Sequence, residues 1–434
     1  MAKNILFRDI YYVDDSFEVK RGDIAVSNGK IAAIGQGSTI APQGFDEVID
    51  GTARLLMPGL INLHCHVPMT LLRGYGEGLP LQRWLNEKVF PFEDKLNPED
   101  VYWGSLIGIA EMLASGVTSF TEMYNFCGEI CEAVKLSGIK TNISRGICEF
   151  GDGGLYGSFR QLEAEALIRD WNGACDGRIL VENTLHSEYL TNERVVREMA
   201  EFAKTSGLGI HLHLSETLSE HLEGVARRGV TPAKYFEDCG IFEHRVTAAH
   251  CTHVSAEDIG ILARNNVTAV HCPSSNLKLG SGVAPVPQML AAGVNVALGT
   301  DGASSNNNLN MFEEMHLAGI IHRGVAMNPE LTPAAQVIRM ATKNGAAGQG
   351  RFDTGTIAVG NRADLAVLNL NKPHLTPVHD IISDIVFATQ ASDVEMTIVD
   401  GELVYRNGEF LKFDIFGAME KAEQAAHRIA AELN

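Results

Sequence analysis

The pattern of apolar and polar positions divides the chain into a central part and two ends. Between about residue 56 and residue 302, short apolar runs alternate with longer stretches of helical character, which indicates a parallel sheet with crossover helices. Eight such runs occur, ending near residues 66, 123, 147, 187, 216, 252, 276 and 302. Eight parallel strands close a (β/α)8 barrel, so we expect one here.

Both ends of the chain are predicted to be short strands instead. The dipeptides Asn28-Gly29, Asp400-Gly401 and Asn407-Gly408 lie between β-rich runs and favour tight hairpin turns. We therefore expect an α/β chain with a small β-sandwich built from both chain ends. Its predicted parts are sandwich strands at 1–57 and 355–412, the barrel at 58–354, and a closing amphipathic helix at 413–434.

Composition and charge narrow the class of protein. Of the 434 residues, 45% are hydrophobic and 21% charged, and no apolar run is long enough to cross a membrane. The net charge of −19 argues against a nucleic-acid partner. The first residues carry no secretory signal, and the eight cysteines include no CxxC pair. We expect a cytoplasmic homo-oligomer with reduced thiols and no membrane contact.

The stretch "GLINLHCHVPM", residues 59–69, ends the first apolar run with two histidines. Because side chains alternate along a strand, His64 and His66 point to one side and Cys65 to the other, toward the surrounding helices. Taken alone, the pair fits two hydrogen-bonded core histidines as well as it fits a metal site. We expect Cys65 to be buried and away from any metal.

Further polar residues occur at the ends of later runs, on the face where barrel enzymes build their sites. The fifth run, "HLHLSE", contains His211, His213 and Glu216, and the eighth, "GTDG", contains Asp301. Histidine nitrogens and a carboxylate oxygen together suit a zinc-like ion, which lowers the pKa of bound water to about 7. Glu216 fits a proton shuttle, and the alternative is a carboxylate that caps a helix.

In this order the motifs resemble the amidohydrolase superfamily along essentially the whole chain: "PGLINLHCH", "HLHLSE", "AAHC", "GTDG" and "GTIAVGNRADLAVLNL". The resemblance implies that His211 packs beneath the site and that His250 touches the reacting centre. The fourth run, "ILVENTLHS", lacks the lysine that bridges two metals in binuclear members, so we expect one divalent ion per subunit, with Zn2+ preferred. The implied metal ligands are His64, His66, His213 and Asp301.

A closer resemblance is to the methylthioadenosine / S-adenosylhomocysteine deaminases, on "FPFEDKL", "SRG", "LHS", "CPSSNLKLGSGVAPV" and "GTDGASSNNNLNMFEEM". It implies zinc-dependent hydrolytic deamination at C6 of an adenine nucleoside, which is 5′-methylthioadenosine, S-adenosylhomocysteine or adenosine. In this reaction Asp301 takes a proton from water, Glu216 protonates N1, and His250 helps to orient the attacking oxygen.

The same resemblance implies the contacts to the substrate. Glu93 would bind the ribose hydroxyls, Arg145 the 5′ substituent and His186 the purine, with Glu216 at its N1. Glu93 has an alternative as part of a solvated charge cluster, and Arg145 as a salt bridge at the barrel rim.

One departure concerns the 5′ substituent. Some family members carry a second arginine shortly after the third strand, but here Arg160 lies 15 residues after Arg145 and Gly157 stands nearer the usual spacing. This favours neutral 5′ groups, those of methylthioadenosine or adenosine, over S-adenosylhomocysteine.

Two other functions are alternatives for this sequence. The same chemistry could deaminate or dechlorinate another nitrogen heterocycle, such as guanine, a pterin or an s-triazine. The chain could also be a catalytically inactive scaffold, but such relatives typically lose metal ligands and here every expected ligand is present.

Overall fold

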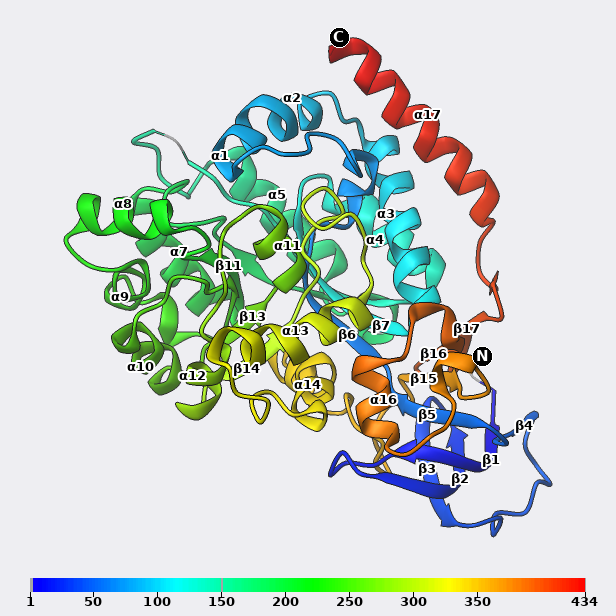
Figure 1. Cartoon of the computed structure of the whole chain (residues 1–434). Helices are drawn as coiled ribbons and strands as arrows, with labels where there is room; N and C mark the ends of the chain where they lie inside the picture. The colour runs from blue at the N-terminus through cyan, green and yellow to red at the C-terminus, as the bar shows by residue number, and fades with distance from the viewer. Residues whose placement is uncertain (1–2, 150, 434) are drawn as a thin grey trace.

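The computed structural model describes residues 3–149 and 151–433, and its centre is a TIM-barrel-type fold (Figure 1). Parallel strands lie in chain order in two hydrogen-bonded sheets, and the N–H of Asp301, just after the last strand, donates to the carbonyl of His64 in the first at 3.0 Å. The strands are β6 (Leu60–Cys65), β7 (Val117–Tyr124), β8 (Lys140–Arg145), β9 (Ile179–Val181), β10 (Asn183–Thr184), β11 (Ile210–Leu214), β12 (Val246–His250), β13 (Thr268–His271) and β14 (Asn295–Leu298).

Helices connect these strands and cover their outer side (Figure 1). Several begin at a capping box, in which an Asn, Ser or Thr side chain and an acidic side chain three residues later satisfy the first free N–H groups. The main helices are α3 (Pro98–Ala114), α4 (Cys127–Ser137), α5 (Phe159–Trp171), α6 (Ala174–Gly177), α7 (Glu193–Ser206), α8 (Leu218–Arg228), α9 (Pro232–Asp238), α10 (Ala256–Arg264), α11 (Pro273–Lys278), α12 (Val286–Ala291), α13 (Met311–Ala326), α14 (Ala334–Ala341) and α15 (Lys343–Gln349).

Several strands end earlier than the apolar runs predict. The seventh was expected to reach residue 276, but β13 ends at His271 because Pro273 opens α11. Proline is well suited to the first turn of a helix, where a backbone N–H would have no partner within the helix. The fourth run divides into β9 and β10 and ends at Thr184 instead of residue 187. The residues beyond these ends form the irregular segments that carry the site.

Strands from the two ends of the chain form one nine-stranded sheet, in the order β18-β17-β16-β15-β5-β1-β2-β3 with β4 paired to β1. All three expected dipeptides lie at hairpin turns with positive φ at both residues, which is the signature of a type I′ turn. The strands are β1 (Ile5–Val13), β2 (Val19–Ser27), β3 (Lys30–Gln36), β4 (Glu47–Asp50), β5 (Arg54–Pro58), β15 (Leu365–Asn369), β16 (Val394–Val399), β17 (Glu402–Arg406) and β18 (Glu409–Phe410).

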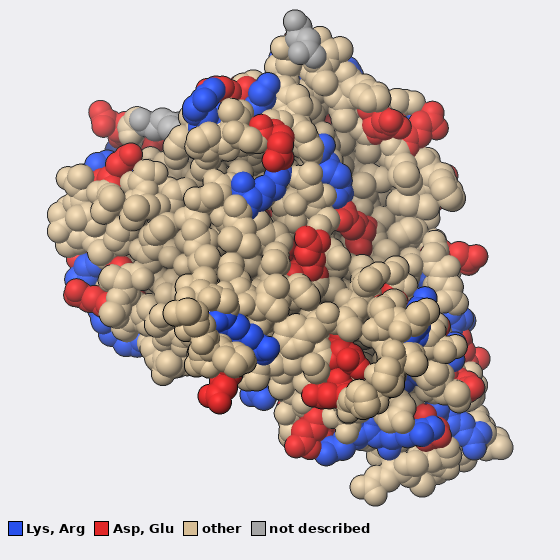
Figure 2. Space-filling view, viewed as in Figure 1, with Lys and Arg blue, Asp and Glu red and all other residues tan. Residues whose placement is uncertain are grey.

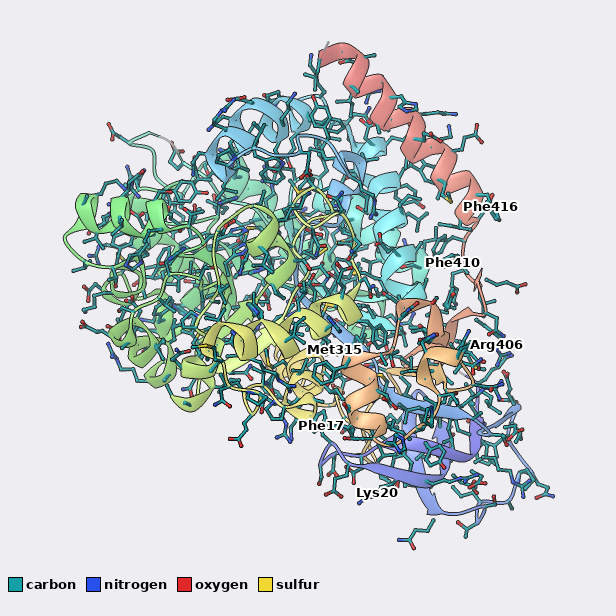
Figure 3. All side chains as sticks on the ribbon, in the orientation of Figure 1. Phe17, Lys20, Met315, Arg406, Phe410 and Phe416 are labelled. Atoms are coloured by element: carbon teal, nitrogen blue, oxygen red, sulfur yellow. The ribbon has the colours of Figure 1, made fainter. Side chains whose placement is uncertain are left out.

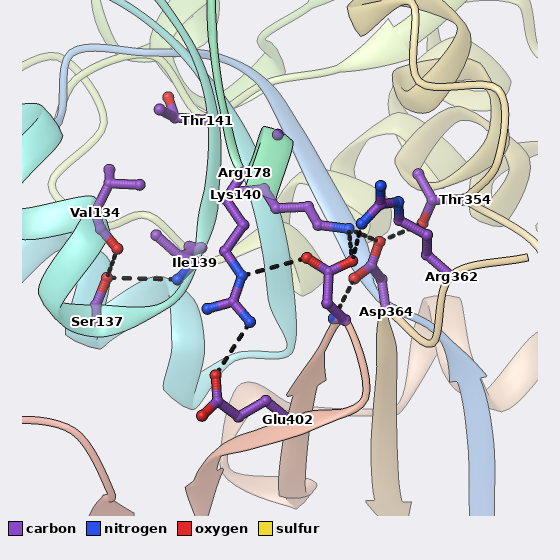
Figure 4. A network of polar contacts seen from close by, with 12 residues as sticks. Val134, Ser137, Ile139, Lys140, Thr141, Arg178, Thr354, Arg362, Asp364 and Glu402 are labelled. Carbon is purple, nitrogen blue, oxygen red and sulfur yellow. Dashed lines mark hydrogen bonds and ion pairs between the residues drawn. The ribbon is translucent and has the colours of Figure 1, made fainter. Parts of the chain in front are cut away.

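A buried charge network joins this sheet to the barrel (Figure 4). The Lys140 ammonium of β8 lies 2.6 Å from Asp364 and 2.7 Å from Asp400, and Arg178 and Arg362 also contact Asp400. Lys140 is only 1% exposed. A buried ammonium is tolerated because carboxylates surround it.

The last helix, α17 (Ile415–Leu433), lies along α3 on the outside of the barrel, and Phe410 and Phe416 flank the connection that leads to it (Figure 3). Its buried residues recur at a helical spacing: Ala418, Ala422, Ala425 and Ile429. It also contacts α2 (Phe90–Glu93), which follows α1 (Leu81–Trp84). A further short helix, α16 (Ile381–Phe387), packs against α13 and α14.

Acidic and basic side chains are interspersed on the face drawn in Figure 2. Among the described helices, none combines the length and apolar character needed to cross a bilayer.

Candidate active site

The predicted site residues gather around one cavity of about 400 Å³ at the carboxyl ends of the barrel strands. His64 and His211 lie deeper and are fully buried. The other sequence-predicted residues all line the cavity: His66, Glu93, Arg145, Arg160, His186, His213, Glu216, His250 and Asp301.

His64 of β6 and His66, directly after this strand, both face one carboxylate oxygen of Asp301. The Nε2 atoms of His64 and His66 lie 3.3 Å and 3.4 Å from Asp301 Oδ1. The His66 Nδ1–H donates to the carbonyl of Met123 at 2.8 Å, which leaves its Nε2 as a lone pair facing an anionic oxygen. Three acceptor atoms this close together repel one another unless a cation lies between them, so the arrangement fits a bound cation.

A second group of donor atoms adjoins the first. Nitrogens of His64, His213 and His250 lie within 4.8 Å of one another, and the His213 Nδ1–H donates to the carbonyl of His186 at 2.8 Å. His64 Nε2 is buried and has no hydrogen-bond partner among the described residues. His64 belongs to both groups, and a buried ring nitrogen without a hydrogen-bond partner suits a metal ligand. The donor set therefore fits a divalent metal such as zinc.

The protonation states suit metal binding. Burial lowers the pKa of His64, His66 and His213, which keeps these rings neutral. The set therefore offers neutral imidazoles and one carboxylate.

His211 has a more specific place than simple packing. Its Nε2 lies 3.0 Å from Nδ1 of His64, and burial lowers its pKa to about 3. A hydrogen bond between these two rings fixes the orientation of His64.

Glu216 lies beside the donor set, two residues after β11. Its Oε2 is 3.8 Å from His250 Nε2, and the Ser281 hydroxyl lies 3.5 Å from its Oε1. Burial raises the pKa of Glu216, which favours the protonated form more than in a solvated carboxylate. Glu216 is not itself the helix cap, because Thr217 caps α8.

Glu93 and His186 line other walls of the cavity. Burial raises the pKa of Glu93 to about 7, and the Tyr124 hydroxyl opposes that shift. The His186 ring stacks on His213 with centroids 4.5 Å apart, and burial lowers its pKa to about 3. His186 is therefore a neutral hydrogen-bonding group, and Glu93 is a half-buried acid that lines the cavity.

Arg145 lines the cavity, as the proposed substrate contact requires, and it also forms a salt bridge at the barrel rim, which was the alternative expectation. Its Nε donates to Glu163 Oε2 at 2.6 Å, and its Nη1 donates to Asn125 Oδ1 and the carbonyl of Gly146, each at 2.6 Å. Arg160 lines the same cavity, and its guanidinium stacks on Phe159 at 4.5 Å.

Comparison with known proteins places this site in a family. The model described as "Amidohydrolase family" matches residues 55–404. The chain belongs to the amidohydrolase family. A 5-methylthioadenosine/S-adenosylhomocysteine deaminase of Acetivibrio thermocellus is 45% identical over 385 residues, covering 88% of this chain and 89% of that protein.

Two further amidohydrolase relatives extend the comparison. A 5′-deoxyadenosine deaminase of Methanothermobacter thermautotrophicus is 41% identical over 412 residues, which cover 95% of this chain and 96% of that protein. The crystal structure of a zinc-bound adenosine deaminase from Xanthomonas campestris superposes with a TM-score of 0.92 at 32% identity, covering 99% of each chain.

Several side chains of this amidohydrolase site were not predicted from the sequence. Glu122 of β7 accepts hydrogen bonds from the N–H groups of Val67 and Met123, and it is fully buried 3.9 Å from His66. Its signal was a charged residue inside an otherwise buried strand. The remaining groups are short polar side chains that no spacing rule selects: Ser275 and Ser305 on Asp301, and Asn276 on His250.

Proposed function

We propose that the protein catalyses hydrolytic deamination at C6 of an adenine nucleoside, releasing ammonia and an inosine-type product. The observation that carries this proposal is the acid Glu216 beside a donor set of neutral histidines and Asp301 in one cavity. The relatives named as adenine nucleoside deaminases, at 41% to 45% identity, support it. Deamination makes the protein a hydrolase of cyclic amidine C–N bonds.

The proposal includes one divalent metal ion per subunit, preferably Zn2+. His64, His66, His213 and Asp301 would hold it, with His250 adjacent. When bound, such an ion makes water a nucleophile near neutral pH.

The chain's own side chains then move the protons. Asp301 accepts a proton from the attacking water, and Glu216 gives its proton to N1, which makes C6 electrophilic. His250, hydrogen-bonded through Nδ1 to Asn276 at 2.9 Å, orients the water oxygen. Asp301 then passes the proton that it took from water to the amino group, the C6 hydroxyl proton returns to Glu216, and ammonia leaves while N1 keeps its proton in the inosine-type product.

The cavity walls suit a nucleoside. Glu93 would accept both ribose hydroxyls as a carboxylate, His186 would contact the purine, and Arg145 would lie near the 5′ substituent. Because Arg145 is already paired with Glu163, neutral 5′ groups are favoured.

Ammonia release from four compounds tests the proposal: adenosine, 5′-methylthioadenosine, S-adenosylhomocysteine and guanine. We expect turnover of the nucleosides and little of guanine. A Glu216→Gln variant should keep its metal content, measured by elemental analysis, and lose about 10²- to 10⁴-fold in kcat because the proton donor is gone. Preference for guanine, or a near-normal rate in Glu216→Gln, would contradict the assignment.

A further part of the proposal concerns the domain boundaries and the oligomeric state. We propose sandwich parts at 1–57 and 355–412, the barrel at 58–354 and the closing helix at 413–434. The apolar core shared by strands from both chain ends supports a small β domain built from both, in which these strands form one sheet. The homo-oligomer remains a prediction, to be checked by light scattering.

A further inference from the structure

Arg145 has little hydrogen-bonding capacity left for a ligand. A guanidinium binds a carboxylate bidentately either through its two terminal nitrogens or through Nε and one terminal nitrogen. In this structure Glu163 occupies Nε, and Asn125 and the Gly146 carbonyl occupy Nη1. Only Nη2 has no hydrogen-bond partner among the described residues, so an incoming carboxylate can bind Arg145 through a single nitrogen.

Glu163 is the partner that a substrate could replace. It lies on α5, and its side chain is 54% exposed, whereas that of Arg145 is 9% exposed. Asn125 and Gly146 are neutral and follow the ends of β7 and β8, so Glu163 alone among these partners opposes the positive charge of Arg145. A half-exposed carboxylate pair is weakly held, and its removal leaves no buried unpaired acid.

We propose that Glu163 is a specificity-determining residue, which disfavours nucleosides with a carboxylate on the 5′ substituent by competing for Arg145. The inference rests on the proposed deamination and deepens it. Nucleosides with neutral 5′ groups do not need the Nε of Arg145, so Glu163 leaves their binding unaffected.

Arg160 supplies a contrast within the same cavity. Its guanidinium stacks on Phe159, and the structure pairs it with no carboxylate in the part of the chain that it describes. A substrate carboxylate therefore meets the guanidinium of Arg145, whose charge is neutralised by Glu163, and that of Arg160, whose charge is not. Removing the charge of Glu163 changes only the guanidinium of Arg145.

The test compares S-adenosylhomocysteine with 5′-methylthioadenosine in wild type and Glu163→Gln. We expect the ratio of their kcat/KM values to rise about three- to tenfold in the variant, in favour of S-adenosylhomocysteine. The change should lie in the KM of S-adenosylhomocysteine with kcat unchanged, because the carboxylate is remote from C6 and binds equally in ground and transition states.

Glu165→Gln is the matched control. Glu165 is an exposed acid on the same helix, and the structure gives it no contact with Arg145. This variant therefore makes the same change in net charge but leaves Glu163 free to compete with the substrate carboxylate for Arg145. Equal shifts in both variants, or no shift in Glu163→Gln, would overturn the inference.

A double-mutant cycle tests whether Glu163 acts through Arg145. In an Arg145→Gln background, Glu163→Gln should leave the ratio unchanged, because there is no guanidinium to compete for. An undiminished shift in that background contradicts competition. Absence of turnover of both nucleosides by wild type refutes the proposed function and the inference with it, whereas an unchanged ratio with active wild type refutes the inference alone.

Discussion

Glu93 is the residue that we propose to hold the two ribose hydroxyls, and its protonation state would decide how well it does so. Burial raises the pKa of Glu93 to about 7, so the carboxyl is neutral below that pH and ionised above it. Only the ionised form accepts hydrogen bonds with both oxygens without donating one. Binding of a ribose should therefore strengthen as the pH increases through about 7.

The prediction is measured as the ratio of kcat/KM for wild type to that for Glu93→Gln, which cancels the titration of other groups. We expect this ratio to increase from about pH 6 to about pH 8 and then to level off. Asp94→Asn is the control: its charge contributes to the raised pKa of Glu93, so the rise should persist and move to lower pH. A ratio that is flat across this range would contradict ribose binding by Glu93.

Cys65 illustrates what alternation along a single strand can predict. It is fully buried, and burial raises the pKa of its thiol well above the usual range. It is absent from both groups of donor atoms in the described part of the chain. The neighbouring His64 and His66 face the site because they stand one residue to either side of it.

At the scale of the element, helix α8 positions the proposed proton donor. Its capping box pairs Thr217 with Glu220, and a Glu220 carboxylate oxygen also accepts the backbone N–H of Glu216 at 2.7 Å. The residue before Glu216, Ser215, has a φ of 46°, in the left-handed region that residues other than glycine seldom adopt. The helix start therefore fixes a backbone turn that aims Glu216 into the cavity.

We expect Glu220→Ala to lower the free energy of unfolding by about 1 kcal/mol and kcat by roughly ten- to a hundredfold, because a small displacement of Glu216 misaligns it. Glu220→Gln retains an acceptor oxygen and should recover most of kcat. Asp258→Ala removes the equivalent acid from the capping box of α10, which carries no proposed catalytic residue, and should lower stability with little change in kcat. Chemical denaturation and steady-state kinetics measure the two effects, and similar kcat values for the two alanine variants would refute the positioning role.

At the scale of the whole molecule, the network around Lys140 holds the nine-stranded sheet against the barrel. Strand β8 supplies the ammonium, and Asp364 and Asp400 come from segments at the far end of the chain (Figure 4). Losing the cation would leave the buried Asp364 without a basic partner, whereas Asp400 keeps Arg178 and Arg362.

Lys140→Met should therefore lower the free energy of unfolding by about 3 to 5 kcal/mol and leave KM unchanged in the folded fraction. Lys135→Met is the matched control, since Lys135 forms an exposed pair with Glu132 and should contribute no more than about 1 kcal/mol. Thermal unfolding at fixed scan rate compares the variants, and equal losses would show that the network contributes no more than a surface pair.

Much of the site could be predicted from the sequence because strand and turn signals are local. Eight apolar runs indicated the barrel type, and the residues at their ends, such as His64, His213 and Asp301, were identified before their geometry was known. The hairpin dipeptides were correct for the same reason, since a type I′ turn depends on two adjacent residues. The resemblance to a family then supplied Glu93, Arg145 and His186, which no local pattern selects.

Only the tertiary structure decided which groups meet across the barrel. His211 is joined to His64, Glu122 anchors the segment after β6, and Glu163 occupies Arg145, although these pairs are separated by 147, 55 and 18 residues. The sequence determines periodicity, turns and the order of strands because these depend on neighbours along the chain. Contacts between distant side chains depend on how the strands close and how helices pack on them, and this is why the partner of Arg145 became visible only in the folded molecule.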